Sequence, residues 1–313
     1  MRKLIAICIP CFNEQDNIIE LYKRLKNTLA KKTEYDYSIL FADNCSTDKT
    51  LDLIKNLIKE DNRVGLIKNV SNFGFVRSSA NALLAPDADA NIFLMADLQD
   101  PPELILDLID EWALGRKQVI FATRKSSREN KLLFFCKKFY YFMLSWLSNY
   151  PMVRDTTGFG IYDKVVIQAL RKSIDSYPYI KGLVCAIGFN WSTISYVSAD
   201  RRAGRSSAKL SFLIDFGVLG IVTSSRKPMR IITLTGTLIG VFSLVFSFLV
   251  LITKFLYWDS FQFGIAMLST SLLFLSGMIL FSLGVIGEYV GFINQRALKL
   301  PLVIESERIN VNN

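Results

Sequence analysis

Apolar and polar positions follow one pattern over the front part of the chain and another near its end. The front part alternates continuous apolar runs, typical of buried strands, with stretches of helical apolar spacing. These patterns predict strands at residues 4–10, 37–42, 64–68, 91–96 and 119–123 and helices at residues 16–30, 47–59, 76–84 and 102–112. Strands that alternate with such helices predict an α/β fold with a mainly parallel sheet, whose ligands bind at the carboxyl ends of the strands.

Two apolar runs without a charged residue, 231–253 and 260–287, follow near the end of the chain. A helix of about 20 apolar residues spans a bilayer, and the connector between the runs is too short to fold alone. We therefore expect a two-helix transmembrane hairpin at 231–293. Basic residues flank it on both sides, which places the front domain and both termini in the cytoplasm. These residues are Arg226, Lys227, Arg230, Arg296 and Lys299.

Two further segments border on the predicted membrane part. Residues 211–225 are apolar with few charges, so we expect a helix that lies on the membrane surface. Residues 131–150 are aromatic and basic, which fits either an interfacial helix or a core helix of the front domain. The expected organisation is a front domain at 1–210, an interface helix at 211–230, the hairpin at 231–293 and a cytoplasmic tail at 294–313.

Composition limits which ligands the front domain is expected to bind and which catalytic groups it can use. The 313 residues carry a formal net charge of +9 and include no histidine. Beside a membrane segment, the basic excess favours lipid headgroups or phosphate over nucleic acid, for which no motif is present. Without histidine, Ser–His and Cys–His catalysis are excluded. Any proton acceptor near neutral pH is then a carboxylate, a lysine or the substrate itself.

The five cysteines are odd in number and scattered, as expected for reduced cytosolic thiols. Cys8 and Cys11 form a C-x-x-C pattern, which fits either a redox pair or the end of a buried strand. A structural zinc site needs about four nitrogen or sulfur ligands. A chain with one such pair and no histidine does not provide them.

Compact polar clusters follow three of the predicted strands. Residues 9–14 read IPCFNE, residues 42–48 read ADNCSTD, residues 96–103 read ADLQDPPE, and residues 287–291, in the second apolar run, read GEYVG. In this order, and over nearly the whole chain, they resemble family-2 inverting glycosyltransferases of GT-A fold. The resemblance is to the polyisoprenyl-phosphate branch, which includes bactoprenol glucosyltransferases and dolichol-phosphate mannose synthases.

This resemblance implies a GT-A domain followed by the interface helix and the hairpin. It implies transfer of a sugar, with UDP-glucose as the expected donor, to undecaprenyl phosphate with inversion. The expected location is the cytoplasmic face of a bacterial plasma membrane, and we expect the hairpin to mediate homo-oligomers.

The resemblance also assigns roles to polar residues at the strand ends. Nucleotide binding is implied for Pro10, Phe12, Asn13, Glu14, Asp43 and Asn72. Asp97 and Gln99 offer the oxygen ligands that Mg²⁺ or Mn²⁺ prefers. Asp97 and Asp155 are the implied catalytic residues, Asp155 in a base-like or positioning role. The simpler alternatives are a loop cap for Asp43, surface polarity for Asp97 and Gln99, and a structural turn for Asp155.

Two basic clusters are candidates for binding phosphate groups, because guanidinium forks suit phosphate oxygens. The alternative is a solvated basic face. The clusters are Arg124 and Arg128 after a strand, and Arg201, Arg202, Arg205, Ser206 and Lys209 before the surface helix. Lys181 matches a basic position of the family more weakly. Asp100 precedes Pro101-Pro102-Glu103, a pattern that favours a helix N-cap over a metal ligand.

The sequence departs from the family at several motif positions. The departures are Asn44 for the second of two paired aspartates, Met95 for the first aspartate of the metal motif, Ser71 for an arginine, Thr157-Gly158 for a frequent Gly-Asp, and Ser207 for a lysine. They affect the choice of nucleobase and sugar and leave Asp97 and Gln99 in place. The rival hypotheses are an inactive scaffold, a processive polysaccharide synthase and a lipid-binding module without enzymatic activity.

Overall fold

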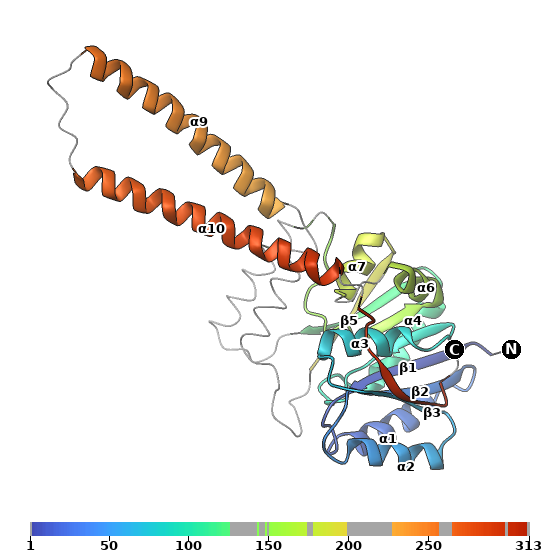
Figure 1. Ribbon diagram of the computed structural model, residues 1–313. Coiled ribbons are helices and arrows are strands. Elements are labelled where there is room, and N and C mark those ends of the chain that lie inside the picture. Colours follow the sequence, from blue (N-terminus) through green and yellow to red (C-terminus); the bar gives the residue numbers. More distant parts are fainter. Residues whose placement is uncertain are drawn as a thin grey trace.

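A sheet flanked by helices forms the main body of the molecule, and two long helices, α9 and α10, extend away from it (Figure 1). The computed structural model describes residues 2–125, 143, 148, 150–173, 178–198, 227–256, 265–297 and 300–311. The sheet positions the candidate site, and most of the exposed large apolar side chains among the described residues lie on the two helices.

Four parallel strands form the centre of the sheet, in the order β3-β2-β1-β4. They are β1 (Leu4–Cys11), β2 (Asp36–Asp43), β3 (Val64–Asn69) and β4 (Ala90–Phe93). Helices cover both faces, so these strands are continuous apolar runs, as predicted. The register places Cys11 at the end of β1 beside Asp43 at the end of β2. The carboxyl ends of the strands therefore meet at one edge.

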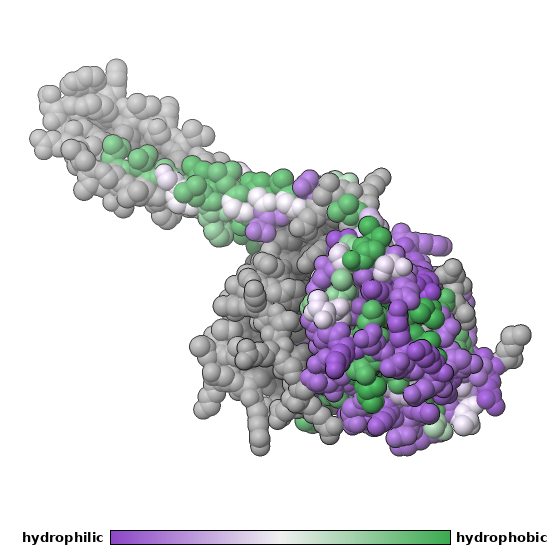
Figure 2. Space-filling view, turned by 60° about the horizontal axis from the view of Figure 1, so that its bottom comes forward, coloured by the Kyte–Doolittle hydropathy of each residue, from purple (hydrophilic) through white to green (hydrophobic). Residues whose placement is uncertain are grey.

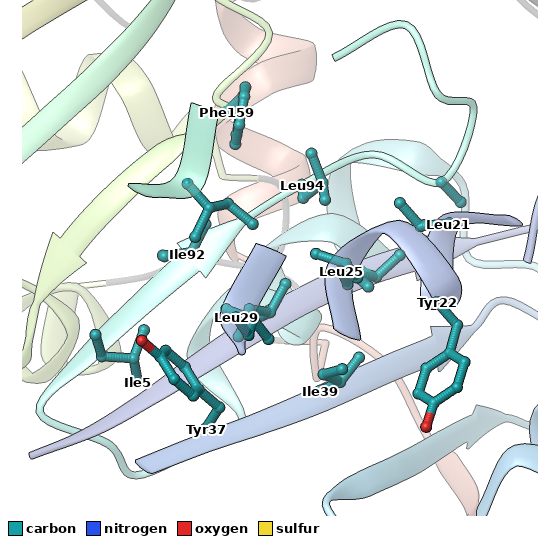
Figure 3. Close-up of a cluster of buried hydrophobic side chains, with 14 of the residues drawn as sticks. Ile5, Leu21, Tyr22, Leu25, Leu29, Tyr37, Ile39, Ile92, Leu94 and Phe159 are labelled. Carbon is teal, nitrogen blue, oxygen red and sulfur yellow. The ribbon is translucent and has the colours of Figure 1, made fainter. Parts of the chain in front are cut away.

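Alternate residues of the central strands point into cores on opposite faces of the sheet. Ile5, Ile7 and Ile9 of β1 belong to the larger core. Figure 3 shows part of this core, with Ile5 near Leu29 and Tyr37. The helices that complete this core are α1 (Ile18–Leu29), α2 (Thr50–Glu60) and α4 (Ile105–Ala113), the last preceded by the 3₁₀ turn η1 (Pro102–Leu104). The opposite face packs against α3 (Phe75–Leu84), α6 (Lys164–Ser173) and α7 (Ile180–Ile187).

Strands on both sides of the parallel centre make the sheet mixed. β5 (Val119–Lys125), β6 (Gly160–Asp163) and β7 (Trp191–Val197) extend it beyond β4, with β6 antiparallel to its neighbours. β8 (Glu305–Ile309) pairs antiparallel with β3 at the opposite edge. The apolar pattern predicts β5 but none of β6, β7 and β8. The expected tail at 294–313 thus contributes a strand to the sheet.

Two long helices, α9 (Lys227–Leu256) and α10 (Ile265–Ala297), include all of the first apolar run and residues 265–287 of the second, which confirms that these residues are helical. Apolar side chains are exposed along both, among them Leu238, Phe242 and Leu268. Figure 2 shows apolar surface on the part of the molecule that extends away from the sheet. Threonine, serine and glycine recur within the helices and lower their mean hydropathy. In the part of the chain that the structure describes, no helix has the length and apolar character that crossing a membrane requires, so the expected transmembrane hairpin is not supported.

Two expected segments near the membrane part are largely outside the described residues. The predicted surface helix at 211–225 is outside them entirely. Of the aromatic segment at 131–150, residues 143, 148 and 150 are described. Residues 227–230, which we expected at the end of the interface helix, form the first turn of α9.

Candidate active site

Four loops at the carboxyl edge of the sheet hold non-glycine residues in the left-handed backbone region. Asn13 follows β1, Cys45 follows β2, Leu98 follows β4 and Asp155 precedes β6, with φ angles of 56°, 65°, 58° and 55°. Such conformations cost of order 1–3 kcal/mol each and persist only where neighbouring contacts fix them. Their concentration at the edge where ligands bind in α/β sheets identifies this edge as the candidate active site.

The loops after β1 and β2 are joined by reciprocal hydrogen bonds. The Asn13 N–H donates to Ser46 Oγ (2.9 Å), and Asn13 Oδ1 accepts the Thr47 N–H (2.8 Å). Pro10 lies in the last part of β1, and Phe12 leaves more than a third of its surface exposed in the loop that follows. The structure therefore brings the predicted nucleotide-binding residues after β1 next to those after β2.

Asp43, the last residue of β2, is fully buried. Its carboxylate accepts the Ser46 N–H, at 3.1 Å from the nearer oxygen. This bond confirms the loop-cap interpretation, and contact with a nucleobase stays a prediction. Glu14 is held nearby, because its N–H donates to Thr50 Oγ1 (2.8 Å) and its carboxylate accepts from Asn17 (2.6 Å).

A cluster of three asparagine side chains ties the loop after β3 to the end of β2. Asn44 Oδ1 accepts from Asn69 Nδ2 and from the Phe73 N–H, both at 3.0 Å. Asn44 Nδ2 donates to Asn72 Oδ1 (2.8 Å), which also accepts the Gly74 N–H (2.9 Å). Asn44 thus uses both the acceptor and the donor of its amide. An aspartate at this position would have no donor for Asn72.

Asn44→Asp is therefore expected to destabilise this cluster, although the side chains have the same shape. The new carboxylate has no hydrogen to donate to Asn72 Oδ1, so two oxygens that only accept face each other. The expected loss in the free energy of unfolding is about 1–3 kcal/mol. Urea denaturation of the variant and the wild type measures this loss. Asn56→Asp, on the exposed face of α2, is the control and is expected to remain within about 0.5 kcal/mol. Equal losses in the two variants would contradict the role of the amide.

The expected metal ligands lie on one turn after β4. Asp97 is buried, and its Oδ1 accepts the Gln99 N–H (3.2 Å) across the left-handed Leu98. Within the described ranges, no group of three His, Cys, Asp or Glu side chains forms a complete metal cage. A carboxylate and an amide oxygen instead fit a divalent cation that takes its remaining ligands from substrate phosphates and water.

Asp100 does not cap the helix that follows it, contrary to the sequence prediction. The N-cap position of η1 is Pro101, and no side chain caps it. The fully buried Asp100 carboxylate instead accepts from Arg124 Nη2 (2.7 Å) and Nε (3.1 Å), from the Tyr196 hydroxyl and from Thr157 Oγ1 (3.0 Å). Burial, reinforced by the charge of Asp100, raises the pKa of Tyr196, so this hydroxyl stays protonated as a donor.

Arg124 links the metal turn to the Asp155 loop. Its side chain pairs with Asp100, and Arg124 Nη1 lies 3.5 Å from Gln99 Oε1. Its backbone N–H donates to the Asp155 carbonyl (2.8 Å). The Ser198 hydroxyl holds the same turn through the Gln99 carbonyl (3.2 Å). Binding of a phosphate group by Arg124 stays a prediction. The described contacts make Arg124 a brace between the two candidate catalytic loops.

Lys181 of α7 lies beside the Asp155 loop, with Nζ 3.4 Å from the Thr156 carbonyl. Burial lowers the pKa of Lys181 to about 8, and the charge of Asp155 partly opposes this shift. The turn interpretation of Asp155 agrees with its backbone contacts, and its base-like role stays a prediction.

Lys181→Met is expected to change how stability depends on pH. The folded-state pKa of Lys181 lies below its ordinary value of 10.5, so the unfolded chain binds more protons between about pH 8 and 10.5. The contribution of Lys181 to the free energy of unfolding therefore rises over this interval and is lowest below it. Urea unfolding of wild type and variant from below the folded-state pKa of about 8 up to the ordinary value of 10.5 measures the difference. A difference that stays constant with pH would contradict this expectation.

The structure leaves most of the predicted basic residues untested and decides between the two interpretations of Cys8 and Cys11. Arg128, Arg201, Arg202, Arg205, Ser206 and Lys209 lie outside the described residues. Cys8 and Cys11 are free, their side chains point to opposite faces of β1, and burial raises the pKa of both thiols. The buried strand end is therefore the correct interpretation of the C-x-x-C pattern.

Known proteins are similar to this chain in sequence and in fold. A family model described as Glycosyl transferase family 2 matches residues 6–174, more than half of the chain. The uncharacterized glycosyltransferase YkcC of Bacillus subtilis (strain 168) is 32% identical over 98% of this chain and 95% of its own. The bactoprenol glucosyl transferase of Shigella phage SfV is 28% identical over 97% of this chain and 99% of its own.

A solved structure shows the same fold at low sequence identity. Glucosyl-3-phosphoglycerate synthase from Mycobacterium tuberculosis, in complex with Mn²⁺, UDP and phosphoglyceric acid, has a TM-score of 0.51 at 17% identity, over 71% of this chain and 77% of that chain. This likeness supports the α/β fold of GT-A type expected from the sequence. The family match also spans the loops after β1, β2, β3 and β4 that form the candidate site.

Proposed function

The chain belongs to glycosyl transferase family 2, and we propose that it transfers glucose from UDP-glucose to undecaprenyl phosphate with inversion at the anomeric carbon. The observation that carries the proposal is the buried Asp97–Gln99 turn beside the joined loops after β1 and β2. Relatives named bactoprenol glucosyl transferase, matched over almost their whole length, support the lipid phosphate as acceptor.

The acceptor explains how a chain without histidine performs the reaction. A phosphate monoester is already anionic at neutral pH, so its oxygen attacks the anomeric carbon without a strong base. The new bond joins this oxygen to the anomeric carbon, and the bond to the nucleoside diphosphate breaks. Attack from the opposite face converts an α-linked donor to a β-linked lipid product. Asp155 positions the acceptor, and its loop is anchored through Arg124.

Asp97 and Gln99 would hold the Mg²⁺ or Mn²⁺ ion. When bound, this ion stabilises the charge that develops on the departing diphosphate. The chain prepares the site in advance, because the Asp97–Gln99 hydrogen bond and the Arg124–Asp100 pair fix both ends of the turn. The nucleotide is held by the loops that contain Asn13 and Asn72.

The proposal places the sheet and both termini at the cytoplasmic face of the bacterial plasma membrane, with α9 and α10 in contact with lipid. Leu238, Phe242 and Leu268 leave 68%, 72% and 72% of their surface exposed. An apolar surface of this extent is unfavourable in water and fits a lipid environment. Self-association through these helices, which gives homo-oligomers, belongs to the same proposal.

A transfer assay with purified full-length protein in lipid nanodiscs and Mn²⁺ tests the proposal. Radiolabelled UDP-glucose, UDP-N-acetylglucosamine and GDP-mannose are offered with undecaprenyl phosphate or with undecaprenol, which lacks the phosphate. We expect a lipid product that is labile to mild acid from UDP-glucose and the phosphate acceptor alone. Labelled undecaprenol would contradict the phosphate nucleophile. No product from any donor would favour the inactive scaffold.

A further inference from the structure

The C-terminal segment 300–311 is built into the sheet next to the proposed donor site. β8 runs along β3 beside α3 (Figure 1). The Val70 N–H donates to the Ile304 carbonyl (2.9 Å), so the pairing extends past the carboxyl end of β3. The approach is close, because a Cβ atom on Gly65 would lie 2.8 Å from the Asn310 carbonyl oxygen.

Arg77, in the first turn of α3, connects this segment to the loop after β3. Its Nε donates to the Leu302 carbonyl (2.7 Å) and its Nη2 to the Pro301 carbonyl (2.6 Å). The guanidinium also stacks over the Phe73 ring, with 4.9 Å between the Arg77 Cζ and the ring centroid. One side chain therefore binds the C-terminal segment and the loop at 70–74 at the same time.

The same loop is also bound to the end of β2, through Asn44. The Phe73 N–H donates to Asn44 Oδ1 (3.0 Å), and Asn72 accepts from Asn44 Nδ2 (2.8 Å). The loop at 70–74 thus has two supports, the end of β2 through Asn44 and the C-terminal segment through Arg77. Both supports bear on Asn72, which is among the proposed nucleotide-binding residues.

We propose that Arg77 is a positioning residue that makes segment 300–311 part of the donor site. It holds the loop at 70–74 in the conformation that binds the nucleoside diphosphate of the donor. This inference rests on the proposed function and adds a component to its site. Leu300 follows the last residue of α10, Ala297, by three positions. The same contact therefore connects the α9–α10 hairpin to donor binding.

Arg77→Gln tests the inference, and the chain offers a matched control. Arg171 binds backbone carbonyls in the same way, with Nε to Leu84 (2.8 Å) and Nη2 to Pro86 (2.8 Å), at the far end of α3. Arg171→Gln removes equivalent bonds without contact to the loop at 70–74. Arg77→Lys keeps one charged donor and is the rescue variant. All proteins are full-length and reconstituted in lipid nanodiscs.

Two readouts separate positioning from a loss of stability. Hydrogen exchange of the amides at 70–74 is expected to be at least about tenfold faster in Arg77→Gln and unchanged in Arg171→Gln. UDP affinity, measured calorimetrically with Mn²⁺, is expected to fall about tenfold in Arg77→Gln, to recover partly in Arg77→Lys and to be unchanged in Arg171→Gln.

Unchanged exchange at 70–74 in Arg77→Gln would overturn the inference and leave the proposed function standing. Equal loss of UDP affinity in Arg77→Gln and Arg171→Gln would also overturn it, because the effect would then follow stability. If the wild type bound no nucleotide, the proposed function would fail, and the exchange readout would still decide whether Arg77 holds the loop.

Discussion

Asp97→Asn is expected to lower the rate of sugar transfer by at least about 10²–10³-fold, the loss seen when one group that stabilises transition-state charge is removed. Asp97 is the charged member of the proposed ligand pair, and its partner Gln99 is neutral. Asparagine retains an Oδ1 that can accept the Gln99 N–H, so the turn is expected to keep its conformation. The rate is measured with saturating UDP-glucose and a titration of Mn²⁺.

The control for Asp97→Asn is Glu103→Gln, which removes a carboxylate six residues further along the chain. Glu103 is half-exposed and pairs with Arg24 at the surface (2.6 Å), so its loss is expected to leave the transfer rate within about twofold. Thermal unfolding of both variants confirms that they are folded. An Asp97→Asn protein that transfers glucose at the wild-type rate would contradict the assignment of the metal site.

Asp100→Ala is expected to have the largest effect on stability, about 3–5 kcal/mol, because it breaks a buried ion pair by removing one partner. The Arg124 guanidinium would remain in a partly buried site without its carboxylate, and the Tyr196 and Thr157 hydroxyls would lose their acceptor. Urea denaturation measures the loss. Tyr196→Phe, which removes one hydroxyl from the same network, is expected to cost only about 1 kcal/mol.

A double variant distinguishes the effect of losing the Asp100–Arg124 ion pair from the cost of leaving the Arg124 charge without a partner. In Asp100→Ala with Arg124→Met no guanidinium is left without a partner, so this protein is expected to be more stable than Asp100→Ala alone. Losses from Asp100→Ala and Arg124→Met that simply add would contradict the buried pair. The Arg124 contacts to Gln99 and Asp155 lead us to expect that both single variants also lower the transfer rate.

The centre of the fold could be predicted from the sequence because it depends on local patterns. β1 to β4 are buried on both faces, so their apolar runs are continuous, and the helices between them show clear apolar spacing. β8 has no such signal. Its sequence ESERI contains one apolar residue, Ile309, and no alternation of apolar and polar residues. It becomes a strand because β3 offers an unpaired edge.

Asp100 shows why the site could be predicted only in part. The sequence Asp100-Pro101-Pro102-Glu103 matches a capping pattern, but the two prolines have no N–H, so only the Glu103 N–H of this turn is available to a capping carboxylate. The partners that capture Asp100 are 24, 57 and 96 residues away in the sequence, as Arg124, Thr157 and Tyr196. No local pattern reports such contacts. By contrast, Asp97 and Gln99 are two positions apart, and one turn brings them together.

For the long helices, too, the local sequence pattern predicts the secondary structure but not the tertiary contacts. The charge-free runs predict the helices α9 and α10, which the structure confirms. An apolar run predicts a helix, but it does not by itself show whether lipid or protein contacts the exposed apolar side chains of that helix.

The most direct test of the central claim is the structure of the lipid product that the wild-type protein forms from UDP-glucose and undecaprenyl phosphate. Proton NMR of the purified product gives the configuration at the anomeric carbon, and the released UDP is quantified in the same reaction. We expect a β-linked glucosyl phosphate lipid, with one UDP released per product molecule. An α-linked product, or UDP released without a glycosylated lipid, would contradict it.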